Sequence, residues 1–130
     1  MKKVVAHSIA PPPWPSSQGE IVAIEDRLGC LRIEVRELGG EGRLEVSFTQ
    51  VEGLRVLDEM DLTEFWPACS SENGWIFEIT QGGWLSQEIK RPAGLIAHAD
   101  DRLREFLVAG IDDCVSVLAM AAPEIRSIES

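Results

Sequence analysis

Residues 30 to 50 contain two runs in which apolar residues alternate with charged or polar ones. The runs CLRIEVREL (30–38) and RLEVSFTQ (43–50) are separated by the glycine-rich turn GGEG (39–42). Alternation with a period of two places the apolar side chains on one face of a strand. The pair therefore predicts a β-hairpin with one face toward a core and the other toward water.

The predicted water-facing side of this hairpin carries opposite charges. Arg32 and Arg36 on the first strand would face Glu45 on the second. Cross-strand ion pairs contribute a few tenths to about 1 kcal/mol each, so they act more on register than on stability.

Other segments also have the composition of strands. Gly53 interrupts one of them and predicts a bulge. A second hairpin is predicted over residues 75–80 and 84–90, with QGG at its turn, and a third over 103–120. The remaining predicted strands are residues 20–25, 54–57 and 124–128, the last as a short edge strand.

One short helix is predicted near residue 61. Asp61 stands three residues before Glu64, which is the spacing of a capping box at a helix start. Pro67 disfavours helical geometry at Trp66, so the helix should end there after little more than one turn. The predicted fold class is α+β: a predominantly antiparallel β-sheet built from consecutive hairpins, six to eight strands, with one or two short helices.

The 130 residues predict a single domain spanning residues 1–130. Its one compositionally biased segment is PPPWPSSQG (11–19). Four prolines fix the backbone and remove hydrogen-bond donors, so this segment should be an extended connector. Trp14 is expected to anchor it over the edge of the core.

The charge balance excludes several partners. Twelve Lys and Arg against 22 Asp and Glu give a net charge of −10, which repels nucleic acids and anionic membranes. We expect neither a secretory leader nor a membrane-spanning segment, because the N-terminal apolar stretch is short and interrupted and the apolar runs are too short to span a membrane. Three cysteines without metal-ligand spacing suit a reducing compartment, so a cytoplasmic location is expected.

His98, with Asp100 and Asp101, is the best catalytic candidate by residue type, because a carboxylate can orient an imidazole for general-base work. The sequence offers no GxSxG elbow and no HExxH motif that would give this histidine a group to activate. We therefore assign no catalytic residue, no metal and no cofactor. In an alternative hypothesis, these three residues lie at the mouth of a ligand-binding pocket.

A cluster of acids precedes Trp66. Asp58, Glu59 and Asp61 have spacings of one and three, but they lack the ligand alternation and the glycine of an EF-hand. They predict a negatively charged ridge. Trp66, Trp75 and Trp84 are the expected aromatic anchors near it, since exposed tryptophan is a common binding hot spot, although large aromatics at hairpin ends also close off cores.

Three segments together resemble small, uncharacterised bacterial single-domain proteins, some of which are similar to immunity proteins that neutralise toxins. They are RVLDEMDLTEFW (55–66), GWIFEITQGGWL (74–85) and FLVAGIDDCVSVLA (106–119), about a third of the chain. The resemblance implies a one-domain cytoplasmic binding protein. It transfers no functional residue to this chain.

The first functional hypothesis is therefore a non-catalytic, acidic, immunity-type protein that binds a basic protein, such as a toxin, through its acidic ridge and tryptophans. The alternative is a small-ligand-binding or enzyme-type β-rich domain with His98 at the mouth of its pocket. A homodimer formed through an exposed sheet edge is a third alternative.

Overall fold

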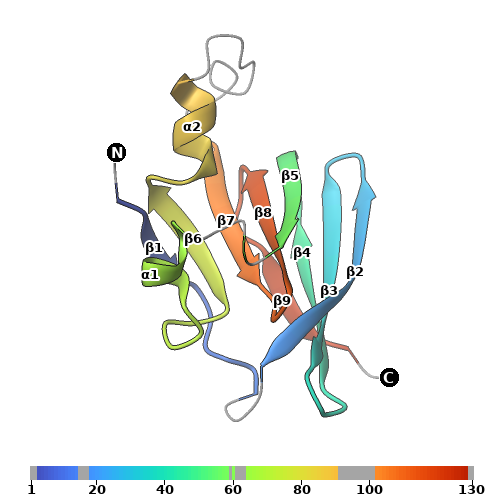
Figure 1. Cartoon of the computed structure of the whole chain (residues 1–130). Helices are drawn as coiled ribbons and strands as arrows, with labels where there is room; N and C mark the ends of the chain where they lie inside the picture. The colour runs from blue at the N-terminus through green and yellow to red at the C-terminus, as the bar shows by residue number, and fades with distance from the viewer. Residues whose placement is uncertain (1–2, 15–17, 59, 61–63, 91–101, 129–130) are drawn as a thin grey trace.

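The computed structural model describes residues 3–14, 18–58, 60, 64–90 and 102–128. In these residues nine strands form two sheets, every strand pair is antiparallel, and two short helices accompany them (Figure 1). The predicted fold class, a β-rich α+β fold, is confirmed. The strand count exceeds the predicted range by one, and β1 (Val5–Ser8) was not expected.

The first sheet has four strands in the order β2-β3-β4-β9. Its strands are β2 (Gly19–Arg27), β3 (Cys30–Glu37), β4 (Arg43–Phe48) and β9 (Glu124–Ser127). The predicted hairpin is β3 with β4, and the predicted edge strand is β9. Arg32 bonds Glu45 at 2.9 Å as expected, whereas Arg36 stands opposite Arg43 instead.

The second sheet has five strands in the order β1-β6-β7-β8-β5. Its other members are β6 (Ile76–Gln81), β7 (Arg104–Ala109), β8 (Asp113–Ala119) and β5 (Val51–Asp58). The predicted hairpin in residues 103–120 is β7 with β8. The register of β5 against β8 shifts between Val51 and Gly53, which confirms the predicted bulge.

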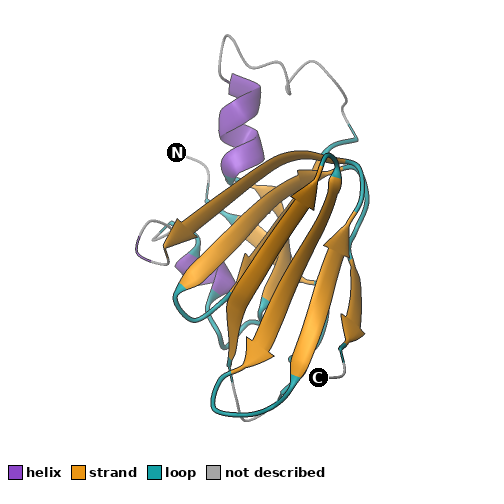
Figure 2. Ribbon diagram, turned by 90° about the vertical axis from the view of Figure 1, so that its right-hand side faces the viewer, coloured by secondary structure: helices purple, strands orange, loops and turns teal. Residues whose placement is uncertain are grey.

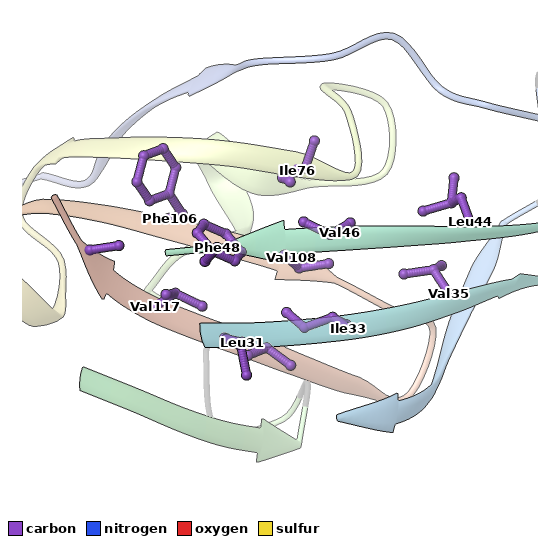
Figure 3. Close-up of a cluster of buried hydrophobic side chains, with 12 residues drawn as sticks. Leu31, Ile33, Val35, Leu44, Val46, Phe48, Ile76, Phe106, Val108 and Val117 are labelled. Carbon is purple, nitrogen blue, oxygen red and sulfur yellow. The ribbon is translucent and has the colours of Figure 1, made fainter. Parts of the chain in front are cut away.

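The main core lies between the two sheets, because each contributes its inward-facing residues to one buried cluster (Figure 3). Leu31, Ile33 and Val46 of the first sheet are fully buried there. Phe48 meets Phe106 of the second sheet with ring centroids 5.4 Å apart and a tilt of 54°. A pair of this kind contributes about 0.5–1.5 kcal/mol beyond the burial of its surface.

The other face of the five-stranded sheet is covered as well. Val4, Phe65, Phe77 and Leu107 form a second buried cluster with Cys69, which lies on α1 (Trp66–Cys69). Since both faces of this sheet are covered, β8 is buried at every position after Asp113. A strand that is buried on both faces loses the alternation that marks β3.

The prediction of a strand over residues 84–90 is wrong. This segment is the helix α2 (Trp84–Lys90), which stands beyond the ends of the strands (Figure 2). The hairpin predicted over 75–90 is therefore wrong in its second half, although its first half is β6. Leu, Gln, Glu and Lys favour a helix, and the carboxylate of Glu105 accepts hydrogen bonds from the backbone N–H groups of Trp84 and Leu85.

The position of the first helix also differs from the prediction. Trp66 is its first residue, and Pro67 lies in its first turn instead of ending it. Proline is compatible with the first helical turn because the N–H it lacks has no partner there. Glu64 lies in the turn before the helix, and Asp61 lies outside the described residues.

Candidate functional site

A cavity of about 330 Å³ lies where three distant parts of the chain meet at one end of the sheets. The connector contributes Pro12, Pro13 and Trp14. The region from α1 to β6 contributes Trp66 and Trp75, together with Ser70 and Ser71. The turn between β7 and β8 contributes residues 109–111. Three of the four tryptophans in the chain therefore line one cavity.

Hydrogen bonds to backbone carbonyls hold these parts together. The indole Nε1 of Trp75 donates to the carbonyl of Pro11 at 3.0 Å, and the Trp75 carbonyl accepts from the N–H of Ala109 at 2.8 Å. The N–H of Ile111 donates to the carbonyl of Gly19 at 3.0 Å. The cavity wall is therefore tied to both sheets.

Trp14 is fixed by two glycines. A Cβ atom on Gly42 would stand 2.3 Å from its indole Nε1, and a Cβ atom on Gly19 would stand 3.3 Å from its ring. The ring thus lies against backbone where no side chain intervenes. Trp14 also packs against the main core, so the expectation that it anchors the connector there is met.

The lining described by the structure is largely uncharged. Its polar side chains include Gln18, Ser70 and Ser71, and its titratable group is the Cys69 thiol. Burial raises the pKa of Cys69 to about 12, and the negative charge of Glu105 adds to the increase. A thiol with this pKa is protonated near neutral pH, so Cys69 is unsuited to nucleophilic chemistry.

The predicted binding residues separate into two groups. Trp66 and Trp75 line the cavity, together with Trp14, for which the sequence predicts only an anchoring role. Trp84 does not line it: its indole Nε1 donates to Glu88 at 3.3 Å, and the guanidinium of Arg55 lies 4.8 Å from its ring centroid.

Asp58 is exposed and lies directly opposite Asp113 at the end of the ladder between β5 and β8. Its carboxylate accepts a hydrogen bond from the N–H of Met60 at 2.9 Å. Asp112, in the adjoining turn, is exposed as well. Asp58 is the described member of the predicted ridge, and we call Asp58, Asp112 and Asp113 together the acidic patch.

Glu59 and Asp61 of the ridge lie outside the described residues, and so do His98, Asp100 and Asp101 of the alternative pocket.

The sequence did not predict a buried polar cluster around Glu105, on the face of the five-stranded sheet that also carries Leu107 of the second buried cluster. Glu105 is 1% exposed, and its two hydrogen bonds to the start of α2 are 2.8 and 3.1 Å long. Burial raises the pKa of Glu105, although these hydrogen bonds and the charge of Arg55 oppose the increase. A glutamate inside the apolar run of β7 was the available signal. Because Glu105 accepts hydrogen bonds at the start of α2, a structural role accounts for its burial and no catalytic role is needed.

Among the described residues, no group of three His, Cys, Asp or Glu side chains is placed to hold a metal ion. None of the described helices is long and apolar enough to cross a membrane. Comparison with protein-family models, with curated proteins and with solved structures finds no match to this chain.

Proposed function

We propose that this protein is a non-catalytic binding protein whose cavity, lined by Trp14, Trp66 and Trp75, takes up a small organic ligand. The observation that carries the proposal is the convergence of three tryptophans, one from the connector and two from the region that runs from α1 to β6, on one cavity of about 330 Å³. Small-molecule sites have volumes of about 300 Å³ or more, mostly apolar walls and a few polar groups that set orientation. Gln18, Ser70 and Ser71 supply such groups here.

The chemistry of the lining supports binding over catalysis. The high pKa of Cys69 keeps its thiol protonated, and general acid or base catalysis needs a group that titrates near the working pH. We also propose a cytoplasmic location, because an odd number of cysteines, two of them buried, suits a reducing compartment.

Thermal-shift screening of small aromatic and heterocyclic compounds tests the proposal. A ligand at about 100 times its Kd stabilises the folded protein by about 2.7 kcal/mol through mass action. Ser71→Phe places a bulky side chain at the cavity and should remove the shift. Thr49→Phe is the matched control, because Thr49 is exposed and follows the end of β4 that is remote from Trp14. Equal shifts in both variants would contradict the proposal.

A second candidate function, an immunity-type protein that binds a basic toxin, is favoured by the acidic patch. Like charges placed directly opposite each other on neighbouring strands are destabilising, and Asp58 faces Asp113 in this way. With a net charge of −10, such a patch would steer a basic partner toward the protein.

The test of this candidate first asks whether the neighbouring gene encodes a basic protein, and then measures association with that protein. Asp58→Lys combined with Asp113→Lys should slow association with that protein and flatten its salt dependence. Glu52→Lys, which reverses an exposed charge elsewhere on β5, is the control. Unchanged association kinetics in the double variant would rule out the patch as the docking surface.

A further inference from the structure

The described cavity lining is largely uncharged, so the preferred charge of a ligand depends on the charged residues around the cavity. Exposed acids flank the lining along the chain: Glu72 follows Ser71, and Asp112 follows Ile111. The whole chain carries a net charge of −10. A cleft with low-dielectric walls focuses such a field, so anions are repelled from the cavity and cations are drawn to it.

Two basic residues near the lining point away from it. Arg36 follows Val35, and successive side chains of a strand lie on opposite faces, so buried Val35 reaches the cavity while Arg36 is exposed on the outer face. Arg43 makes an ion pair with Glu34 on that outer face. Neither guanidinium therefore belongs to the cavity lining.

The walls also select the kind of cation. A primary ammonium group is strongly hydrated and needs hydrogen-bond acceptors when it leaves water, whereas an alkylated ammonium group presents carbon to its surroundings. Tryptophan is the aromatic side chain that attracts cations best, and this attraction strengthens when the cation is desolvated. Three indoles and a lining of prolines, glycines and small side chains suit the alkylated cation.

We infer that the cavity formed by Trp14, Trp66 and Trp75 selects a small organic cation of the quaternary ammonium type. The inference rests on the proposed function, since it names the ligand class of the same cavity. The negative surroundings draw the cation in, the indoles contact its alkyl groups, and Gln18, Ser70 or Ser71 bonds any polar substituent it carries.

The test compares two probes of the same shape and different charge: choline and its neutral isostere 3,3-dimethylbutan-1-ol. Calorimetric titration of the full chain should show choline binding about tenfold tighter, because a desolvated cation–π contact is worth about that factor. Raising the salt concentration should weaken choline binding and leave the neutral probe unaffected.

Two variants and one control locate the binding. Trp66→Leu and Ser71→Phe should each weaken choline binding at least about fivefold, as expected for the loss of one cation–π contact or of cavity space. Trp84→Leu should leave it unchanged, because Trp84 lies outside the cavity lining and already has Arg55 over its ring. Circular dichroism of each variant verifies that it is folded.

The possible failures are distinguishable. If both probes bind equally and both are weakened by the cavity variants, the preference for a cation is wrong and the proposed function stands. If neither probe binds, the cation inference is wrong, and the compound screen decides the proposed function separately. If choline binding is lost in Trp84→Leu and kept in the cavity variants, the ligand sits elsewhere and both are wrong.

Discussion

The indole ring of Trp14 lies against the backbone of Gly42, so closely that a Cβ atom on the glycine would stand 2.3 Å from its Nε1. Gly42 belongs to the turn between β3 and β4, and Trp14 belongs to the proline-rich connector. One contact therefore joins the cavity wall to the most regular hairpin of the fold. A methyl group at residue 42 cannot be accommodated unless the indole moves.

Gly42→Ala should consequently displace Trp14 and disturb the cavity. We expect a change in tryptophan fluorescence, loss of ligand-induced thermal shifts, and a loss of about 1–3 kcal/mol of stability, typical of overpacking. Gly39→Ala is the control, because Gly39 lies in the same turn with φ of +76° and nothing within 4 Å of an added Cβ. It should cost stability through backbone strain without changing the fluorescence. Identical spectra for both variants would contradict the role given to Gly42.

A second prediction concerns the buried cap of α2. Glu105→Ala leaves the N–H groups of Trp84 and Leu85 without their acceptor and removes a negative charge near half-buried Arg55. We expect a loss of about 1–3 kcal/mol, since two N–H groups at the start of α2 lose their acceptor. Urea denaturation measures this loss. Glu52→Ala, an exposed change on β5, should be nearly neutral.

The stability difference between wild type and Glu105→Ala should depend on pH. Burial raises the pKa of Glu105 above its ordinary value of 4.5, so the folded protein holds the proton more tightly than the unfolded chain. The contribution of Glu105 to stability is therefore fully present below pH 4.5 and decreases as pH rises toward the folded pKa. The difference between wild type and Glu105→Ala should shrink over that interval. A difference that grows with pH would contradict the buried position.

The strands could be predicted wherever only one of their faces is buried. β3 and β4 alternate because one face packs on the core while Arg32 and Glu34 stand on the other. Residues 84–90 were assigned wrongly because WLSQEIK has no clear period of two or of 3.6. The helix is stabilised in part by Glu105, which accepts a hydrogen bond from the N–H of Leu85. Glu105 lies on β7, later in the chain, so the local sequence of residues 84–90 does not contain this signal.

The cavity could be predicted only in part. Trp66 and Trp75 were recognised as binding anchors because tryptophan is common in binding sites. Their convergence with Trp14 depends on how the two sheets pack together, which brings the turn between β7 and β8 beside the start of β2. Local patterns do not encode such contacts between distant segments. The sequence placed Trp84 with Trp75 because a hairpin was predicted over residues 75–90, and the second half of that hairpin is wrong.

A third prediction uses Glu45, whose carboxylate accepts hydrogen bonds from Arg32 at 2.9 Å, Ser47 at 3.0 Å and Arg126 at 3.2 Å. The hydrogen bond from Arg32 lowers the pKa of Glu45 to about 2, against the opposing effect of burial. This lowered pKa gives a contribution to stability that is fully present above pH 4.5 and is lost as pH falls toward 2.

Glu45→Gln should therefore be less stable than wild type by about 1–2 kcal/mol at pH 7, and the difference should shrink between pH 4.5 and 2. Urea midpoints measured across this interval test the prediction, with Glu41→Gln in the exposed turn as the control. A constant difference down to pH 2 would mean that the three bonds do not depend on the charge of Glu45.

A final prediction concerns the turn between β2 and β3, where Arg27 pairs with Cys30 and only Leu28 and Gly29 lie between them. Both turn residues have positive φ, 41° at Leu28 and 96° at Gly29, as in the type I′ turns that favour Asn-Gly. Leucine in this conformation costs about 1–2 kcal/mol, and its side chain is fully exposed, so no burial offsets the cost.

Leu28→Asn should therefore raise the free energy of unfolding by about 0.5–1 kcal/mol, because asparagine tolerates the left-handed conformation that leucine resists. The urea midpoint should rise without a change in the slope of the transition, since the variant buries the same surface. Leu38→Asn is the matched control: Leu38 is also an exposed leucine, but its φ is not positive. If Leu28→Asn lowers the midpoint, then Leu28 makes a stabilising contact that outweighs its backbone strain, and the fully exposed position assigned to it here is wrong.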